Sequence, residues 1–429
     1  MMDFAATELG LAGQRAAAAR GYVTPTAVQL AVIPAILAGR DVWACAQTGS
    51  GKTAAFALPL IERCAAATSG QPLQVLILVP TRELAAQVGA ACAAYAQFAA
   101  RRLKVVTAHG GVSINPQMMA LRGGVDLLIT TPGRLLDLFE HNALQPNALT
   151  TLVLDEADRL FDLGFAEELA AILAILPKAR QNLLFSATFP PAVHTLAEQL
   201  LHEPLRIDIA AGENTTPRIT QRAIRVDRPR RTQLLRHLIE QHGWPRTLVF
   251  TATRYTTEHV AEKLRRLGLS AAALHGELSQ AARTQALTNF KAGRLQVLLA
   301  TDLAARGIDI VELPAVVNYD LPRSTEDYLH RIGRTGRAGA AGVAVSFVTV
   351  DSAAHFDLIE KRHALMLPRE VLAGFEPDES AVAPAPANGG IKGKRASKKD
   401  RLREAAARGD QPEEIPHKPF VWPSPPRAS

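Results

Sequence analysis

The residues best suited to chemistry are the glycines, lysine and threonine that close segment 46–53, Ala-Gln-Thr-Gly-Ser-Gly-Lys-Thr. An apolar run precedes this segment and a helical pattern follows it, which predicts a strand, a glycine-rich turn and a helix. In that context backbone N–H groups point at phosphate oxygens, and the positive end of the helix adds to the attraction. We expect Lys52 to reach the β- and γ-phosphates of a nucleoside triphosphate and the Thr53 hydroxyl to ligate Mg²⁺. The alternative, a helix start with a surface lysine, would not require the whole pattern.

Two acidic residues follow a later apolar run, where Asp155 and Glu156 come directly after segment 152–154. We expect Asp155 to hold Mg²⁺ and Glu156 to orient or deprotonate the attacking water. Adjacent acids after a strand are also typical of an ordinary helix N-terminus. The phosphate loop upstream favours the catalytic interpretation.

Three arginines, Arg331, Arg334 and Arg337, are interleaved with glycines in segment 330–337. Several guanidinium forks can bind one anion together. We therefore interpret Arg334 and Arg337 as arginine fingers supplied across a cleft, each worth about 10³–10⁵ in rate. A basic loop on a basic protein is the simpler alternative.

A glutamine precedes the phosphate loop in the stretch 21–29, which begins Gly-Tyr-Val-Thr-Pro-Thr and ends at Gln29. A glutamine amide carries donors and an acceptor side by side, which suits the N6/N7 edge of adenine. The alternative is a capped helix with an exposed glutamine.

The pattern around these residues predicts an α/β fold with two similar halves. Short apolar strands alternate with helical stretches, and polar clusters stand where the strands end, which favours parallel sheets with helices on both faces. The strands expected in the first half are 42–45, 75–79, 103–108, 125–130, 151–154, 182–185 and 205–209, and in the second half 247–251, 271–274, 297–300, 316–319 and 343–348. The second half lacks a phosphate loop of its own.

Length and composition agree with two domains and a tail. We expect an N-terminal domain over residues 1–210, a linker over 211–222, a C-terminal domain over 223–368 and a disordered basic tail over 369–429. The net charge of +7 favours a polyanionic partner, and the tail is interpreted either as an RNA tether or as a solubilising segment. The cysteines Cys45, Cys64 and Cys92 fit buried free thiols in a reducing compartment, and no membrane span or secretory signal is expected, so we predict a cytoplasmic protein.

Taken together, these stretches resemble the DEAD-box ATP-dependent RNA helicases of superfamily 2, in the manner of the bacterial RhlE-type members. Segment 155–158 reads Asp-Glu-Ala-Asp, and the resemblance extends over residues 1 to about 365. It implies two tandem RecA-like domains that use ATP and Mg²⁺ and bind RNA through its backbone. Ala27 departs from the family pattern, which usually has proline there.

The resemblance also implies roles for individual residues. Implied nucleotide contacts are Phe4, Tyr22, Thr24, Gln29, Ala46, Gln47, Thr48, Gly49, Ser50, Gly51, Lys52, Thr53 and, for the ribose, Asp309. Implied RNA contacts are Pro80, Thr81, Arg82, Gly110, Gly111, Thr131, Gly133, Arg134, Gly276, Arg283 and Thr301. Implied coupling residues are Asp158, Ser186, Thr188 and His330, and Gln280 matches a second-domain motif position.

The expected activity is RNA-stimulated ATP hydrolysis, coupled to cleft closure and local unwinding of short RNA duplexes without sequence specificity. Partners of ribonucleoprotein, RNA-decay or ribosome-assembly type are compatible with the resemblance, and no membrane partner is expected. Two alternatives stay open: a DNA-translocating helicase, and an RNA-binding scaffold that uses ATP only to clamp a strand.

Overall fold

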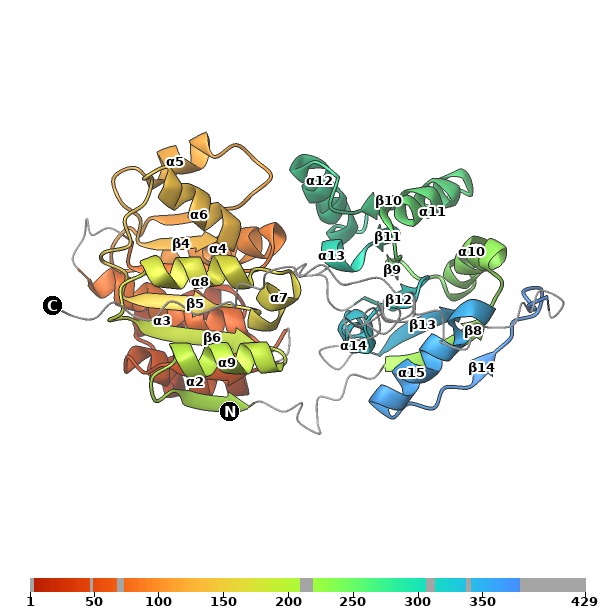
Figure 1. Ribbon diagram of the computed structural model, residues 1–429, viewed down its shortest axis with the longest axis horizontal. Helices are drawn as coiled ribbons and strands as arrows, with labels where there is room; N and C mark the ends of the chain where they lie inside the picture. The colour runs from red at the N-terminus through yellow and green to blue at the C-terminus, as the bar shows by residue number, and fades with distance from the viewer. Residues whose placement is uncertain are drawn as a thin grey trace, which may run out of the picture.

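A computed structural model describes residues 4–46, 49–67, 73–208, 219–305, 313–336 and 341–378. Figure 1 shows two lobes side by side, each built around one sheet. The first lobe comprises the described residues up to 208 and the second lobe those from 219 to 378. None of the helices in the described segments is both long and apolar enough to cross a bilayer.

The first sheet has seven strands in the order β3-β4-β2-β5-β6-β1-β7, and all its recorded pairings are parallel. Every residue of β2, β4 and β5 is buried, as expected for strands covered on both faces. The strands are β1 (Val42–Cys45), β2 (Val75–Leu78), β3 (Val105–Ala108), β4 (Leu127–Thr130), β5 (Thr151–Leu154), β6 (Gln181–Ser186) and β7 (Leu205–Asp208).

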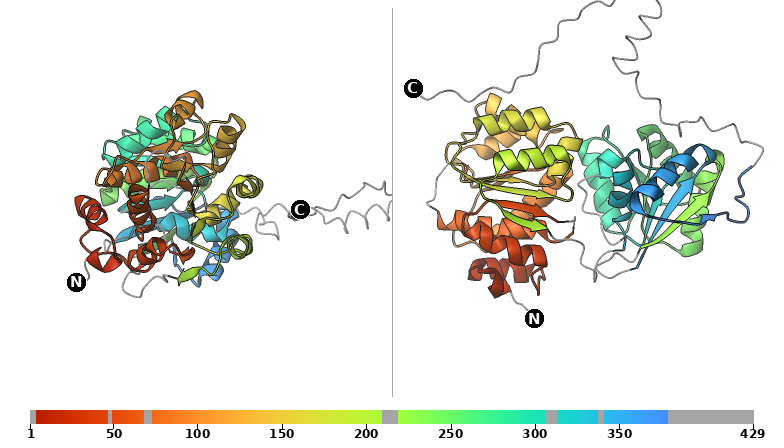
Figure 2. Two further views of the ribbon diagram at one scale, coloured as in Figure 1. Left: turned by 90° about the vertical axis from the view of Figure 1, so that its left-hand side faces the viewer. Right: turned by 60° about the horizontal axis from the view of Figure 1, so that its bottom comes forward.

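Alternate strand residues supply two separate cores. Ile77 and Val153 pack with the helices α1–α4 on one face, whereas Leu76 and Leu152 pack with α6–α9 on the other. Figure 2 shows helices on both faces of each sheet. The helices of this lobe are η1 (Phe4–Thr7), α1 (Leu11–Ala19), α2 (Ala27–Leu37), α3 (Lys52–Ala66), α4 (Arg82–Ala96), α5 (Asn115–Leu121), α6 (Pro132–Glu140), α7 (Ala157–Asp162), α8 (Ala166–Ile175) and α9 (Pro191–Leu200).

The second sheet also has seven strands, in the order β10-β11-β9-β12-β13-β8-β14. Its strands are β8 (Ile219–Arg225), β9 (Thr247–Phe250), β10 (Ala271–Leu274), β11 (Val297–Ala300), β12 (Ala315–Asn318), β13 (Gly342–Val348) and β14 (Arg369–Glu370). One face packs against α10 and α11 and the other against α12–α15. The helices are η3 (Arg228–Arg230), α10 (Arg231–His242), α11 (Arg254–Arg266), α12 (Gln280–Lys291), α13 (Asp302–Ala305), α14 (Thr325–Ile332), η4 (Val350–Ser352) and α15 (Ala353–His363).

This architecture confirms the predicted fold class, but two boundaries differ from the expected ones. Strand β8 begins at Ile219, inside the stretch expected as a linker to residue 222, because its polar residues concealed a strand. The second lobe also continues past residue 368, since β14 pairs with β8 and Phe375 packs on the core. Most of the expected basic tail, from residue 379 onward, lies outside the described residues.

Arg331 ties three elements of the second lobe together. Its guanidinium donates to both carboxylate oxygens of Asp302, at 2.6 and 2.7 Å, and to the side chain of Asn318 at 3.0 Å. It also lies 4.8 Å from the ring centroid of Phe250 and is buried. A bidentate, buried contact of this kind fixes the loops at the carboxyl ends of β9, β11 and β12.

Replacing Arg331 with methionine should destabilise the second lobe by about 3–5 kcal/mol, because Asp302 and Asn318 lose their buried partner. Urea unfolding followed by the fluorescence of Trp244 measures this, in a chain whose Trp43 and Trp422 are replaced by phenylalanine.

The matched control is Arg266→Ala, which removes an exposed ion pair with Glu262. Such pairs contribute about 0–1 kcal/mol. Equal destabilisation by Arg331→Met and Arg266→Ala would contradict the role given to Arg331.

Candidate active site between the lobes

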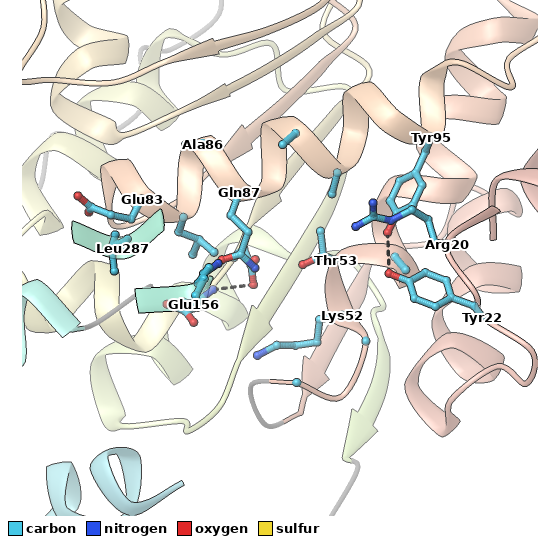
Figure 3. A pocket seen from close by; sticks show the side chains of 18 of the residues that line it. Arg20, Tyr22, Lys52, Thr53, Glu83, Ala86, Gln87, Tyr95, Glu156 and Leu287 are labelled. Atoms are coloured by element: carbon cyan, nitrogen blue, oxygen red, sulfur yellow. Dashed lines mark hydrogen bonds between the residues drawn. The ribbon is translucent and has the colours of Figure 1, made fainter. Parts of the chain in front are cut away.

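A cavity of about 770 Å³ is lined by residues of both lobes. The first lobe contributes the phosphate loop, the acidic pair and the face of α4, and the second lobe contributes α12 and Arg334. Figure 3 shows Lys52 and Thr53 of the first lobe, with Glu83 and Glu156 on the side of the cavity where Leu287 of the second lobe lies.

Lys52 is the charged centre of the phosphate loop. Its side chain is buried, and its ammonium donates a 2.7 Å hydrogen bond to the backbone oxygen of Ala46. Helix α3 begins at Lys52, so its free N–H groups point into the same space. The hydroxyl of Ser50 is buried and has no hydrogen-bond partner in the described part of the chain. These donors fit an anion with several oxygens.

Asp155 and Glu156 face this loop. Burial raises the pKa of Asp155 to about 6, and the neighbouring Lys52 opposes that rise. Glu156 has φ 50° and ψ 53°, a left-handed conformation that is costly for a residue with a side chain. An Asp155 oxygen accepts a hydrogen bond from the Glu156 N–H at 2.9 Å and helps to hold this conformation. Strain retained here is typical of a functional position.

The oxygen atoms of Thr53 and Asp155 fit Mg²⁺, because both residues line the cavity and Mg²⁺ prefers hydroxyl and carboxylate oxygens together with phosphates. The buried carboxylate of Asp155 would also gain a cation that compensates its charge.

Gln29, the residue expected to contact adenine, already has hydrogen-bond partners within the first lobe. It is buried, and its amide nitrogen donates to the Gly51 oxygen at 3.2 Å while its amide oxygen accepts from the Thr26 N–H at 2.9 Å. A capping box with Thr26 begins α2 at this point. The amide keeps one N–H and one lone pair for a base, and it couples the base site to the phosphate loop.

The aromatic residues expected at the nucleotide lie together. Tyr22 and Thr24 line the cavity, and Phe4 stacks on Tyr22 with ring centroids 6.5 Å apart. Phe4 itself is buried and supports Tyr22 from behind the cavity wall.

Three of the expected coupling residues form one hydrogen-bond network. An Asp158 oxygen accepts from the Thr188 N–H at 3.0 Å and from its hydroxyl at 2.8 Å. The Ser186 hydroxyl accepts from the Asp158 N–H and donates to the Thr188 oxygen. His330 lies apart from this network, 3.9 Å from an Asp327 oxygen.

The expected RNA contacts of the first lobe follow β2, β3 and β4, which are neighbours in the sheet. The guanidinium of Arg82 lies over Gly110 and Gly111, where a Cβ on Gly111 would come within 1.9 Å of it. Arg134 is buried and donates to the Val112 oxygen at 2.9 Å, so it supports the same loop from behind. The other members of this set are Pro80, Thr81, Thr131 and Gly133, at the starts of α4 and α6.

In the second lobe the structure gives Arg283 a partner that the sequence interpretation did not foresee. Its guanidinium donates to Glu83 at 2.6 Å and to the His275 oxygen at 3.0 Å. Both ion-pair side chains are less than a tenth exposed. Arg283 therefore bridges the lobes, and its guanidinium is not exposed for contact with RNA. The other two expected contacts of this lobe, Gly276 and Thr301, lie just after β10 and β11.

Some predicted residues are not described, and some cavity residues were not predicted. Gln47, Thr48, Asp309 and Arg337 lie outside the described residues. Lining residues that the sequence did not predict include Arg20, Glu83, Gln87, Ala91, Tyr95, Thr284, Leu287, Thr288 and Lys291. The four-residue spacing of Gln87, Ala91 and Tyr95 was the available signal, because it puts them on one helical face.

The two parallel sheets, and the cavity that residues of both lobes line, are typical of a two-lobed nucleotide-binding protein of the P-loop class. A family model described as DEAD/DEAH box helicase matches residues 26–196, and one described as helicase conserved C-terminal domain matches residues 230–339. The DEAD-box ATP-dependent RNA helicase CshA of Geobacillus kaustophilus is 40% identical over 356 residues, 82% of this chain and 75% of the relative. The chain belongs to the DEAD-box helicase family.

Three further matches agree. The ATP-dependent RNA helicase DeaD of Mycobacterium tuberculosis is 43% identical over 341 residues, 80% of this chain, and the match spans 60% of the relative's length. The structure of S. cerevisiae Dbp5 bound to RNA and ADP BeF3 is similar with a TM-score of 0.75 and 29% identity, covering 86% of this chain and 96% of that one. The structure of Mss116p bound to ssRNA and AMP-PNP gives a TM-score of 0.76 at 28% identity, covering 87% and 78%.

Gly51→Ala should reduce ATP affinity at least roughly tenfold, because its φ is 92° and a Cβ would come within 2.6 Å of the Gln29 amide nitrogen. Titration with a fluorescent ATP analogue measures the affinity.

Gly39→Ala is the matched control, since Gly39 has φ 76° but nothing within 4 Å of its Cβ position. Both variants should lose about 1–2 kcal/mol of stability from the left-handed backbone, and only Gly51→Ala should lose nucleotide affinity. Equal affinities in the two variants would contradict the contact between Gln29 and the phosphate loop.

Proposed function

We propose that the chain is an ATP-dependent RNA helicase, in which bound RNA draws the lobes together and so completes the site that hydrolyses ATP. The observation that carries this proposal is that Arg334, from the second lobe, lines the same cavity as Lys52, Asp155 and Glu156. A guanidinium brought to a triphosphate from the opposite lobe makes hydrolysis depend on closure. The relatives named as RNA helicases and the neighbours with bound RNA support the choice of RNA.

Residues of the first lobe perform binding and proton handling. Lys52 binds the phosphates when its ammonium leaves the Ala46 oxygen, and Gln29 and Tyr22 contact the base. Glu156 orients the attacking water and takes its proton. Thr53 and Asp155 would hold Mg²⁺, and this ion would supply positive charge beside the phosphates.

Arg334 and Arg337 stabilise charge on the phosphates as the bond breaks. The buried pair of Glu83 and Arg283 holds the lobes in register. Glu83 directly follows Arg82, whose guanidinium covers the Gly110–Gly111 loop, so RNA bound there would act on the residue next to the bridge.

RNA is proposed to run from the ends of β2, β3 and β4 to the ends of β10 and β11. Contacts there would be to the RNA backbone, which carries no base information, so binding would be independent of sequence. Preference over DNA would come from 2′-hydroxyl contacts.

We place the protein in the cytoplasm, consistent with three free cysteines, two of them buried. Ribonucleoprotein, RNA-decay or ribosome-assembly complexes are its proposed context.

Comparing ATPase stimulation and strand displacement on matched RNA and DNA duplexes tests this proposal. Stimulation by RNA together with displacement of short RNA duplexes is expected. Equal stimulation by DNA would favour a DNA helicase. ATP-dependent RNA binding without stimulated phosphate release would favour the clamping scaffold.

Glu156→Gln should retain ATP and RNA binding but slow hydrolysis by about 10²–10⁴, because the general base is lost and the side-chain shape is kept. The RNA complex formed with ATP should therefore be long-lived in a filter-binding chase. Rapid RNA release at a normal hydrolysis rate would contradict the role of Glu156.

Arg283→Glu should reduce RNA-stimulated ATPase activity by roughly tenfold or more, since two buried carboxylates would then face each other across the lobes. Basal nucleotide affinity should stay near the wild-type value, because Arg283 contacts Glu83 and the His275 oxygen.

The charge swap Glu83→Arg with Arg283→Glu is the companion experiment and should recover part of the stimulation. If the double variant is as defective as the sum of both single variants, the ion pair does not act across the lobes.

A further inference from the structure

Tyr95 lines the nucleotide cavity from the C-terminal end of α4, where the sequence predicts no nucleotide contact. It lies in the last turn of α4, is 2% exposed, and lines the cavity. Its hydroxyl lies 3.2 Å from the hydroxyl of Tyr22, within hydrogen-bond distance. Figure 3 shows the two rings meeting at their hydroxyl ends, with Arg20 beside them.

Tyr22 is held on two sides. Its backbone N–H donates to the Ala17 oxygen at 3.1 Å, and Phe4 stacks on its ring with an interplanar angle of 23°. These contacts hold the backbone of Tyr22 and one face of its ring in place. The hydroxyl of Tyr95 fixes the far end, so the ring cannot swing while both hydroxyls stay paired.

Tyr95 also borders a second cavity of about 190 Å³, which is lined by residues of α1 and α3 that include Gly13, Ala16 and Ala65, and by residues 98–100. The ring of Tyr95 is buried in the core of the first lobe, so its position is fixed by packing, and its hydroxyl adds a directional contact with Tyr22. The contact between the two hydroxyls therefore orients the ring of Tyr22.

The Tyr95 hydroxyl stays protonated under working conditions. Burial raises its pKa well above the ordinary range for tyrosine, and the hydrogen bond with Tyr22 raises it further. A protonated, buried hydroxyl needs a partner, and Tyr22 supplies it.

We propose that Tyr95 is a positioning residue that holds Tyr22 against the base of the bound nucleotide, so that the hydroxyl pair contributes to adenine affinity and to discrimination between adenine and guanine nucleotides. This inference rests on the proposed function only for the identity of the nucleotide. Tyr95 acts through Tyr22, on the base side of the cavity, so it should change binding and leave the chemical step alone.

Tyr95→Phe in the full chain tests the proposal, because phenylalanine keeps the ring and removes only the hydroxyl. The KM for ATP, and the Kd for a fluorescent ATP analogue, should rise roughly threefold to tenfold, the value of one hydrogen bond. The kcat at saturating ATP and RNA should stay unchanged, and the preference for ATP over GTP should shrink.

Two further variants make the test specific. Tyr22→Phe should give a similar shift, and the double variant should be no worse than either single variant, because both remove the same bond. Tyr255→Phe is the control, since Tyr255 is exposed and stacks on His259 away from the cavity. It should change nothing.

An unchanged KM and Kd in Tyr95→Phe, a fall in kcat at constant KM, or additive effects in the double variant would overturn the proposal. The nucleotide Kd does not depend on hydrolysis or RNA. If the wild-type chain binds ATP but RNA does not stimulate its ATPase activity, the helicase proposal fails. The role of Tyr95 can still be tested through the nucleotide Kd.

Discussion

The buried ammonium of Lys52 is the interaction on which the rest of the site depends. A lysine with so little exposure is stable only if anionic or dipolar groups compensate its charge. The Ala46 oxygen and the carboxylate of Asp155 do so here. A triphosphate can replace the Ala46 oxygen, because the glycine turn and the start of α3 leave N–H groups directed at the same space. The local fold therefore holds a positive charge at the position where the phosphates of a nucleotide would bind.

The second constraint is that each lobe holds only part of the machinery. The phosphate loop, Asp155 and Glu156 belong to the first sheet, and Arg334 belongs to the second. The buried pair of Glu83 and Arg283 contributes across the lobes only when the lobes meet, since neither charge would stay buried alone. In the proposed mechanism, cleft closure would bring these groups together, and they would not act on one another when the lobes are apart.

Local sequence determined the parts that could be predicted. The segment around Gly51 and Lys52 predicts the start of α3, and buried strands such as β2 and β5 are short apolar runs bounded by polar clusters. Pairing across long separations could not be predicted: Glu83 and Arg283 are 200 residues apart. Strand β14 was not predicted, because its two polar residues, Arg369 and Glu370, show no alternation of apolar and polar positions. It pairs with β8, whose Arg222 lies 2.6 Å from a carboxylate oxygen of Glu370, a contact across 148 residues of sequence.

The most direct measurement of the central claim is a structure of the chain loaded with a non-hydrolysable ATP analogue and single-stranded RNA. The account predicts the Arg334 guanidinium within hydrogen-bond distance of the terminal phosphate, with the Lys52 ammonium moved from the Ala46 oxygen to the phosphates. A loaded complex in which Arg334 faces away from the nucleotide would contradict it.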